Sequence, residues 1–373
     1  MTKRVGVIGG GQLARMMIAP AVELGIEIRV LAEQEGMSAA LAATAVGDYR
    51  DVETVRAFAR EVDVVTFDHE HVPQEVLRAL VADGVAVHPG PDALRFAQDK
   101  LVMRARLAEI GAPQPDWAPV RTRADLRAFL DEHGGRAVVK TPRGGYDGKG
   151  VRVVDHEAGA DDWLAAFGGE PILVEELVDF RRELAQQIAR RPSGEAVPYP
   201  VVETVQQDGV CAEVFAPAPH ASDRVVEVAA RIAADIAGGL DVTGLLAVEL
   251  FETTDERLLV NELAMRPHNS GHWTQDGAVT SQFEQHLRAV LDLPLGSSDP
   301  VADAAVMINI LGGPQGATID SRFADAMRDQ PAARIHTYGK DPRPGRKVGH
   351  VNVVGDDLDD AAYAARAAAA FFA

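Results

Sequence analysis

The stretch that decides the fold is GLLAVELF at residues 244–251, followed after a polar turn by LLVNELA at residues 258–264. Both segments are apolar runs of strand length, and a short polar segment separates them. This arrangement predicts an antiparallel hairpin. Its turn is expected to be centred between Asp255 and Glu256.

This predicted hairpin carries two acidic side chains that bear on function. In the register centred on that turn, Glu249 faces Glu262 on one side of the sheet. Like charges directly opposed across two strands are destabilising, and more so in apolar surroundings. A bound Mg²⁺ resolves this conflict, because it takes a few carboxylate oxygens and completes its shell with water and phosphate oxygens. The turn holds no Gly or Asn, so a one-residue slip that leaves two unrelated acids on opposite faces stays open.

A glycine-rich loop between two strand patterns is the second informative feature. The chain reads RAVVK at 136–140, TPRGGYDGKG at 141–150 and VRVV at 151–154. No helix follows the glycines, so no helix dipole helps to bind an anion, as it would in a P-loop. The free amides of the loop, together with Lys140 and Lys149, suit a mobile lid over nucleotide phosphates. A hairpin tip that turns sharply and binds nothing is the alternative.

Roughly the first 95 residues alternate short apolar runs with helical patterns, which favours a parallel sheet of the Rossmann-like kind. The first turn, GGGQLA at 9–14, matches Gly-x-Gly-x-x-Ala, and Glu33 lies near the end of the second expected strand. Such a turn indicates an anion site at a helix N-terminus without naming the anion. A dinucleotide, another phosphorylated ligand and a purely steric turn remain open. Strands are expected at 4–8, 26–31, 62–67 and 85–87, and helices at 12–24, 52–60 and 74–82.

The pattern changes from residue 100, where a helix at 100–110 is followed by a proline-rich connector at 112–119. A strand at 171–177 ends in Glu175 and Glu176, which suit acceptors for an adenine amino group or a ribose hydroxyl; solvated strand-end acids are the alternative. Short extended segments then predict an antiparallel sheet, and an alanine-rich tail predicts a closing helix. The extended segments are 183–190, 199–206 and 209–215, and the tail is 359–373.

The loop RPHNSGHWT at 266–274 follows the second strand of the predicted hairpin directly. A loop so rich in donors, beside a magnesium–nucleotide site, suits an acyl phosphate and its acceptor. His268 and His272 raise the alternative of a zinc site, but no cysteine or carboxylate completes an obvious ligand set. Surface or capping roles for either histidine are the remaining alternative.

Composition restricts the class of protein and its partners. With 373 residues, 47% of them hydrophobic and 25% charged, the chain suits a globular protein of two or three domains. The formal charge of −19, without a segregated basic face, argues against nucleic acid as a partner. The sequence shows neither a membrane-spanning run nor a signal-peptide core, so we expect a cytoplasmic protein without membrane contact. The single cysteine, Cys211, excludes an internal disulfide and favours a buried, inert thiol.

Several of these residues together resemble the ATP-grasp superfamily: Lys140, the glycine loop at 144–150, Glu175, Glu183, Glu249 and Asn261 with Glu262. Further motifs are similar to the N5-carboxyaminoimidazole ribonucleotide synthetase family of purine biosynthesis, and the match covers nearly the whole chain. These motifs are GGGQLARM at 9–16, HNSGHWT at 268–274, SQFEQH at 281–286 and RPGRKVGH at 343–350. The motifs nearer the C-terminus are the specific ones.

The resemblance implies a fold of mixed α/β and α+β class. It is an ATP-grasp fold with an N-terminal Rossmann-like parallel-sheet domain, a small lid domain and a C-terminal antiparallel-sheet domain. The implied boundaries are 1–98 for the first domain, 99–119 for a connector helix, 120–179 for the lid and 180–373 for the C-terminal domain.

The activity that the resemblance implies is that of an ATP-dependent carbon–nitrogen ligase. It carboxylates 5-aminoimidazole ribonucleotide with bicarbonate through carboxyphosphate, and releases ADP and phosphate. The implied metal is Mg²⁺, with Mn²⁺ as an alternative, and the implied assembly is a homodimer. The nearest rival is a formate-dependent glycinamide ribonucleotide transformylase of the same superfamily, and an NAD-dependent dehydrogenase is a more distant one. The Asn-Ser-Gly-His-Trp continuation at 269–273 favours carboxylation.

Site residues carried over by position fall into four groups. The ATP site comprises Arg95, Lys140, Gly145, Tyr146, Asp147, Gly148, Lys149, Gly150, Val151, Glu175, Glu176, Leu177, Val178, Glu183, Gln206, Asn261 and Glu262. The metal ligands are Glu249 and Glu262. The catalytic group is Tyr146, Asp147, Lys149, Arg266 and His268. The ribotide site comprises Gly11, Gln12, Leu13, Glu70, Asn269, Ser270, Arg346 and Lys347.

Three positions depart from the family pattern. Lys149 stands where members often have arginine, so a bidentate hold on an anion becomes a point-charge contact. Gln206 stands where some members have histidine, and FRR at 180–182 replaces a smaller Ser-Gly pair before Glu183.

Overall fold

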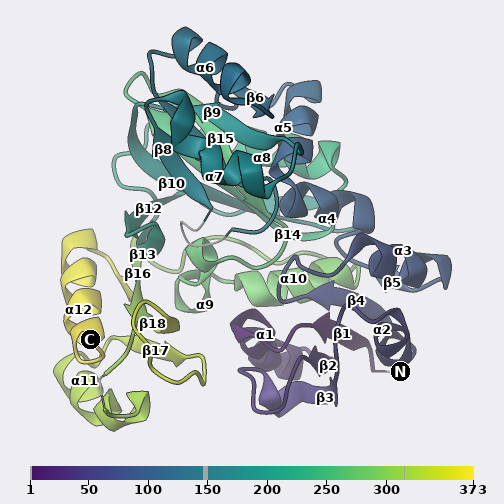
Figure 1. Ribbon diagram of the computed structural model, residues 1–373. Helices are drawn as coiled ribbons and strands as arrows, with labels where there is room; N and C mark the ends of the chain where they lie inside the picture. Colours follow the sequence, from purple (N-terminus) through teal and green to yellow (C-terminus); the bar gives the residue numbers. More distant parts are fainter. Residues whose placement is uncertain (1, 146–149, 315) are drawn as a thin grey trace.

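The computed structural model describes residues 2–145, 150–314 and 316–373, which form three sheets with their flanking helices (Figure 1). The N-terminal sheet is parallel, in the order β3-β2-β1-β4-β5, so the predicted Rossmann-like arrangement is confirmed. Its strands are β1 Arg4–Ile8, β2 Glu27–Ala32, β3 Ala43–Val46, β4 Val64–Phe67 and β5 Ala86–Val87. Its helices are α1 Gln12–Glu23, η1 Ala40–Ala42, α2 Val52–Ala59 and α3 Gln74–Ala82.

Two helices, α4 Pro91–Gln98 and α5 Lys100–Glu109, lead from this domain to a small antiparallel sheet in the order β6-β9-β7-β8. The expected connector over 99–119 ends too late, because Trp117 already pairs with Glu175 inside this sheet. The strands are β6 Trp117–Val120, β7 Ala137–Lys140, β8 Val151–Val154 and β9 Ile172–Glu176. The helices α6 Arg123–Glu132, η2 Glu157–Ala160 and α7 Asp161–Ala166 complete the lid, which encloses its own apolar core.

The largest sheet runs in the order β15-β14-β10-β12-β13-β16-β18-β17, with β11 paired to β10, and its neighbours are antiparallel as predicted. Its first strands are β10 Phe180–Arg190, β11 Ala196–Pro198, β12 Val202–Gln207, β13 Val210–Ala216, β14 Gly244–Thr253 and β15 Leu258–Ala264. The later ones are β16 Ala304–Leu311, β17 Arg334–Thr337 and β18 Lys347–Gly355. Its helical segments are α8 Asp223–Gly239, η3 Asn269–Gly271, α9 Thr274–Gly277, α10 Gln282–Val290, η4 Ile319–Arg322, α11 Phe323–Asp329 and α12 Leu358–Ala370.

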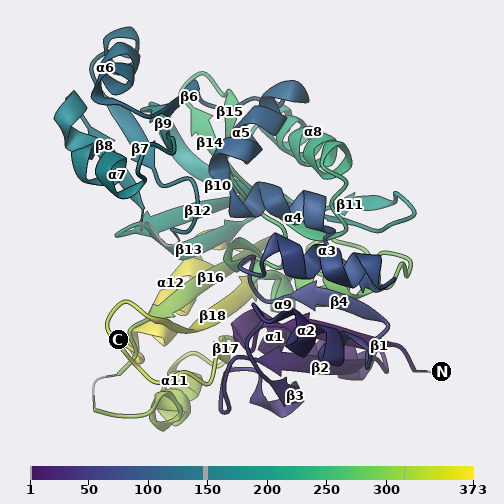
Figure 2. The same ribbon diagram turned by 45° about the vertical axis from the view of Figure 1, so that its right-hand side comes forward.

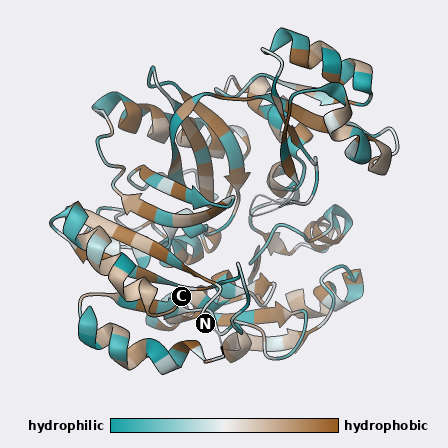
Figure 3. Cartoon of the chain, turned by 60° about the vertical axis from the view of Figure 1, so that its left-hand side comes forward, coloured by the Kyte–Doolittle hydropathy of each residue, from teal (hydrophilic) through white to brown (hydrophobic). Residues whose placement is uncertain are grey.

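Helix α10 joins the N-terminal domain to the large sheet. Its apolar residues Phe283, Leu287 and Val290 are buried together with Leu13 and Met17 of α1. Figure 2 shows the lid and the N-terminal domain at opposite ends of the molecule, with the large sheet between them. In Figure 3 hydrophobic residues are concentrated along the strands, as expected where helices cover sheets.

The closing helix predicted at the C-terminus is α12, which packs on β16 and β18. In the described part of the chain, no helix has the length and apolar character needed to cross a membrane.

Candidate active site

A cavity of about 1720 Å³ lies where the three sheets meet. It is lined by residues of the N-terminal domain, the connector helices, the lid and the large sheet. Most of the expected site residues are brought together here: Gln12, Leu13, Glu70, Arg95, Lys140, Gly145, Val151, Glu175, Glu176, Leu177, Val178, Glu183, Gln206, Glu249, Asn261, Glu262, Arg266, His268, Asn269, Arg346 and Lys347.

A bulge in the β14–β15 hairpin forms one wall of this cavity. The predicted register holds where Val248 faces Leu263, whereas the one-residue slip holds from Leu250, which faces Val260. Between these pairs, Glu249 on β14 stands opposite two residues, Asn261 and Glu262 on β15. Each register expected from the sequence is therefore correct for part of the hairpin. A bulge of this kind re-aims side chains, and here it brings an amide and two carboxylates to the cavity.

The two acids repel each other. Burial, together with the nearby charges of Glu262 and Glu183, raises the pKa of Glu249 to about 8. A divalent cation would relieve this repulsion, so the residues present fit an oxygen-liganded metal. Among the described residues, no group of three or more His, Cys, Asp or Glu side chains could hold a metal ion. A pair of carboxylates suits Mg²⁺, which takes its other ligands from phosphate and water.

A buried charge network stands beside these acids. Lys140 Nζ lies 2.9 Å from Glu175 Oε2 and also donates to Asn261 Oδ1 at 2.9 Å. Arg104 Nε lies 2.6 Å from the other carboxylate oxygen of Glu175. Burial alone would raise the pKa of Glu175, but the charges of Lys140 and Arg104 outweigh it and lower that pKa. Because both of its oxygens are engaged, Glu175 holds Lys140 here rather than presenting a free acceptor for a nucleobase.

Lys100 is a cavity residue that the sequence analysis missed. Its ammonium lies 3.5 Å from Glu262 Oε1, and its backbone N–H donates to Pro142 O at 2.8 Å. The preceding residue, Asp99, pairs with Arg143 at 2.8 Å. The start of α5 is thus attached to the base of the glycine loop. The sequence marked Lys100 only as the first residue of an expected helix, and nothing in it indicated a site residue.

A basic corner of the cavity lies close to the first turn of α1. Lys340 donates to Gln12 Oε1, and the neighbouring loop before β18 adds further cations to the lining. The cations of this corner are Lys340, Arg343, Arg346 and Lys347. Lys340 and Arg343 were not expected as site residues, although Arg343 begins the RPGRKVGH motif.

The loop after β15 occupies the middle of the cavity. Arg266 Nε lies 2.8 Å from Glu70 Oε2, which joins the loop to the N-terminal domain. His268 Nε2 lies 3.4 Å from Glu249 Oε1, and its Nδ1 lies 2.9 Å from Ser270 Oγ. Burial lowers the pKa of His268 to about 3, with further contributions from Arg266 and Lys347, so this imidazole is neutral. It also caps η3, which was one of the expected alternatives.

Asn269 lies in the same loop and lines the cavity. It is only 7% exposed, and neither its amide nitrogen nor its amide oxygen has a hydrogen-bond partner within the described chain. A buried amide with both ends unsatisfied is costly, so this side chain suits a ligand that offers a donor and an acceptor.

The glycine turn at 9–11 does not present an open helix N-terminus. Asp68 Oδ1 accepts from Ala14 N at 2.8 Å, and Glu33 Oε2 accepts from Gly10 N at 3.2 Å. A hydrogen bond to His69 lowers the pKa of Glu33 to about 2. Carboxylates of the protein thus already occupy two backbone amides of this turn. This arrangement counts against a dinucleotide at the turn.

Three expected site residues do not line the cavity. Gly11 packs against Asp68, Ser270 is buried with its hydroxyl on His268, and Gly150 closes the base of the lid hairpin by accepting from Thr141 N. Tyr146, Asp147, Gly148 and Lys149 lie outside the described residues.

Cys211 is half-buried and lines the cavity, so the thiol that was expected to be buried and inert is only partly enclosed. Burial nevertheless raises its pKa to about 12, which keeps it as an unreactive thiol.

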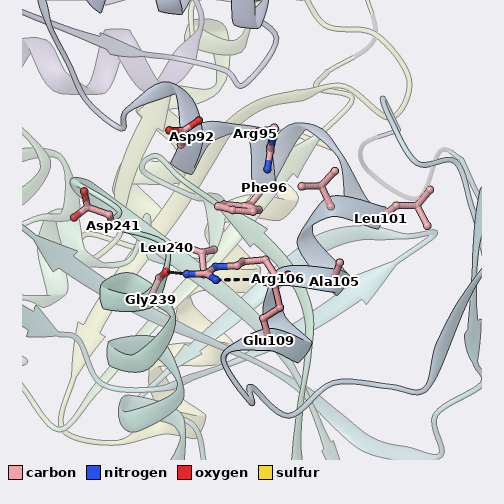
Figure 4. A pocket seen from close by; sticks show the side chains of 11 residues that line it. Asp92, Arg95, Phe96, Leu101, Ala105, Arg106, Glu109, Gly239, Leu240 and Asp241 are labelled. Carbon is pink, nitrogen blue, oxygen red and sulfur yellow. Dashed lines mark hydrogen bonds and ion pairs between the residues drawn. The ribbon is translucent and has the colours of Figure 1, made fainter.

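A second cavity of about 630 Å³ lies between α4, α5 and the end of α8 (Figure 4). Arg95 stands over the Phe96 ring, with 5.6 Å between the guanidinium carbon and the ring centroid, and Arg106 donates to Gly239 O. Cations and anions are mixed in its lining, and Arg95 also reaches the main cavity. No expected site residue other than Arg95 lies here, so the chemistry belongs to the larger cavity.

Fold and cavity together define an ATP-grasp protein. Residues 105–283 match the ATP-grasp domain, residues 1–98 match the ribonucleotide synthetase preATP-grasp domain, and residues 305–364 match the phosphoribosylaminoimidazole carboxylase C-terminal domain. The chain belongs to the N5-carboxyaminoimidazole ribonucleotide synthase family, and the resemblance found in its sequence is confirmed.

Relatives of known name cover nearly the whole chain. The N5-carboxyaminoimidazole ribonucleotide synthase of Mycobacterium tuberculosis is 52% identical over 360 residues, which cover 95% of this chain and 84% of that protein. The N5-carboxyaminoimidazole ribonucleotide synthetase structure from Thermus thermophilus matches with a TM-score of 0.89 at 37% identity, over 98% of each chain. An Aspergillus clavatus synthase in complex with ADP and 5-aminoimidazole ribonucleotide matches with a TM-score of 0.88 at 32% identity, over 99% of this chain and 98% of that one.

Proposed function

We infer that this chain is an ATP-dependent carbon–nitrogen ligase of purine biosynthesis. It converts 5-aminoimidazole ribonucleotide and bicarbonate to N5-carboxyaminoimidazole ribonucleotide, and releases ADP and phosphate. One observation carries the inference: the repelling acids Glu249 and Glu262 share a single cavity with Lys140 and with the basic corner. The names of its relatives and the ADP–ribotide complex of the Aspergillus clavatus enzyme support it.

We assign ATP to the end of the cavity between the lid and the β14–β15 hairpin. Lys140 and Lys100 supply cations for its phosphates, and Gly145 at the start of the glycine loop lines the same cavity. The end of β9, from Glu176 to Val178, lines the cavity beyond Lys140 and suits the adenosine. Lys100 joins Arg95 in this assignment, because its ammonium stands beside Glu262 and both residues line the cavity.

Glu249 and Glu262 would hold Mg²⁺, or Mn²⁺ in its place. When bound, the metal neutralises charge on the phosphate oxygens of ATP. Asn261 is held against Lys140 and orients the bulge from which Glu262 projects. The side chains of this site therefore provide both the carboxylate pair and a fixed cation beside it.

The chemistry proceeds in two steps that need no protein nucleophile. A bicarbonate oxygen attacks the γ-phosphorus of ATP, the bond to ADP breaks, and carboxyphosphate forms. The amino nitrogen of the ribotide then attacks the carboxyl carbon, the C–O bond to phosphate breaks, and the nitrogen releases a proton. Water must be excluded, because carboxyphosphate hydrolyses. We assign Arg266 to the carboxyphosphate, Tyr146, Asp147 and Lys149 to lid closure and bicarbonate, and His268 to the wall that orients the reactants.

The ribotide fits the opposite end of the cavity. Its phosphate matches the basic corner of Lys340, Arg343, Arg346 and Lys347, which lies near Gln12. Asn269 offers a donor and an acceptor that have no partner in the described chain, and this suits the substituted imidazole. Glu70, fixed by Arg266, completes this end from the N-terminal domain.

Phosphate release from ATP tests the function and separates it from its rivals. Purified chain with Mg²⁺ and bicarbonate should release phosphate only when 5-aminoimidazole ribonucleotide is added, with one phosphate for each carboxylated product. Stimulation by formate and glycinamide ribonucleotide instead would identify the transformylase. Binding of NAD without ATP turnover would identify a dehydrogenase.

A homodimer and a cytoplasmic location remain predictions from family resemblance and sequence pattern. Light scattering of the purified chain tests the first, and fractionation of cells that express it tests the second.

A further inference from the structure

Arg104 is a fully buried arginine that bridges three parts of the molecule. It lies on α5, and its side chain has 0% exposure. Its Nε donates to Glu175 Oε1 on the lid strand β9 at 2.6 Å. Its terminal nitrogens donate to Val260 O at 2.7 Å and Asn261 O at 2.8 Å, both on strand β15. A planar fork with fixed donors can satisfy all three acceptors at once, which a point-charge ammonium cannot.

The first consequence of this burial of Arg104 concerns the net charge around Glu175. Glu175 lies between two cations, Arg104 and Lys140, and all three side chains are buried. A Lys140–Glu175 pair by itself would be neutral. With Arg104 the group retains one excess positive charge. Because Lys140 lines the cavity and Arg104 does not, that excess is available to an anion at Lys140.

The second consequence concerns the bulge in the β14–β15 hairpin. Successive carbonyls of a regular strand point to opposite sides, so one side chain on one side does not reach two of them in a row. Val260 and Asn261 both accept from Arg104, at the place where the hairpin register shifts. Among the described residues β15 is the edge strand of its sheet, so no further strand there pairs with these carbonyls. Arg104 fixes the distortion that turns Asn261 and Glu262 toward the cavity.

We propose that Arg104 is a positioning residue of the ligase: it neutralises Glu175, so that the charge of Lys140 serves the ATP phosphates, and it holds the bulge that presents Glu262. Arg104 does not touch the reactants. Its two effects are separable, because the first depends on charge and the second on the forked shape of the guanidinium.

The test compares two substitutions of Arg104. Arg104→Lys keeps the charge but loses the fork, so ATP affinity should stay within about threefold while kcat falls by about tenfold. Arg104→Met loses both, so ATP affinity should also fall by about tenfold. Affinity is measured by calorimetry with a non-hydrolysable ATP analogue, and kcat by phosphate release. Arg106→Met, two residues along the same helix and outside the main cavity, is the matched control and should change neither quantity.

A double substitution separates charge compensation from loss of structure. If Arg104 acts by neutralising Glu175, then Glu175→Gln should restore ATP affinity to the Arg104→Met variant. An equal loss of affinity with and without Glu175→Gln would overturn the charge role. Equal kcat in Arg104→Lys and the unaltered chain would overturn the role at the bulge. If Arg104→Met does not fold, the Arg104→Lys and double variants still decide, since the first keeps a cation beside Glu175 and the second removes the charge of Glu175 itself.

This proposal rests on the proposed function, so ribotide-dependent turnover of the unaltered chain is measured first. Absence of that turnover would refute the proposed function. The comparison of ATP affinity among the Arg104 variants would still test the charge role of Arg104 independently.

Discussion

The ammonium of Lys100 lies 3.5 Å from a carboxylate oxygen of Glu262, so the first residue of α5 partners an expected metal ligand. The Glu262 side chain is 39% exposed and that of Lys100 is 14% exposed, which leaves the carboxylate reachable from the cavity. A lysine in this place offsets part of the repulsion between Glu262 and Glu249. In the ATP complex that we propose, the same ammonium stands beside the phosphates.

Substitution of Lys100 by methionine should therefore raise the KM for ATP. We expect a rise of about tenfold, because one partly buried cation next to the phosphates is lost. Phosphate release at saturating ribotide and bicarbonate measures it. Lys3→Met, an exposed lysine near the N-terminus, is the control. An unchanged KM for ATP would remove Lys100 from the nucleotide site.

Glu262→Gln should abolish most turnover while leaving the fold intact. The amide cannot replace an anionic oxygen as a magnesium ligand, and we expect kcat to fall by about a thousandfold. Phosphate release is measured over a range of Mg²⁺ concentrations, with thermal unfolding as the test of fold. Glu227→Gln on the exposed face of α8 is the matched control. Near-normal turnover of the Glu262 variant would refute the metal assignment.

Much of the fold was predictable because its signals are local. The run RVGVI at 4–8 is a strand because an apolar run of that length is buried on both faces of a parallel sheet, and it forms β1 with the predicted bounds. The hairpin at 244–264 was equally clear, since two apolar runs and a polar turn specify it. Strand Trp117–Val120 was missed because prolines surround it, and its pairing with β9 outweighs that local signal.

The site was predictable only where side-chain type carries the information. Lys140 and the acids Glu249 and Glu262 are unusual in apolar strands, so their chemistry was visible in the sequence. The bulge was not, because the register shifts where Arg104 donates to two backbone carbonyls of β15, and such contacts between distant segments leave no pattern in the sequence. In the sequence Arg104 looks like any arginine of a charged helix. Its burial is a property of the assembled domains.

The choice between Arg95 and Lys100 shows a similar limit. Both residues are cations on consecutive helices before the lid. Only the packing of α5 against the hairpin decides which one approaches Glu262, and it is Lys100. Arg95 lies over Phe96 and lines both cavities.

A pH dependence of stability should arise at His286, away from the metal ligands. This histidine is fully buried, with Nε2 2.7 Å from Thr66 Oγ1 and Nδ1 accepting from Leu245 N at 3.1 Å. Burial, with a smaller contribution from His88, lowers its pKa from 6.5 to about 3. Between those values the unfolded chain binds a proton that the folded chain excludes. The stabilisation is therefore present above about pH 6.5 and is lost as the pH falls toward 3.

His286→Gln should remove this contribution. The free energy of unfolding of the variant should fall less steeply with decreasing pH, by about 1.4 kcal/mol per pH unit in the window below 6.5. Urea unfolding at several pH values gives the slopes. His156→Gln, at an exposed histidine of the lid, should leave the slope as it is. Identical slopes for the His286 variant and the unaltered chain would show that the buried imidazole is not the source.

Gly11→Ala should disturb the first turn of α1 by contact with a single carboxylate. An added Cβ would lie 2.0 Å from Asp68 Oδ2, so Asp68 must move and its hydrogen bond to Ala14 N is lost. We expect a loss of about 1–3 kcal/mol in the free energy of unfolding. The KM for the ribotide should also rise, because Gln12 and Leu13 follow directly and line the cavity.

The control for this substitution is Gly238→Ala, which has no atom within 4 Å of the added Cβ and lies inside α8. Alanine is the better helix former, so we expect this variant to be neutral or about 0.5–1 kcal/mol more stable. Urea unfolding and ribotide titrations of both variants decide the question. If Gly11→Ala matches Gly238→Ala in both measurements, then the turn tolerates a side chain, and Asp68 does not hold the ribotide end of the cavity in place.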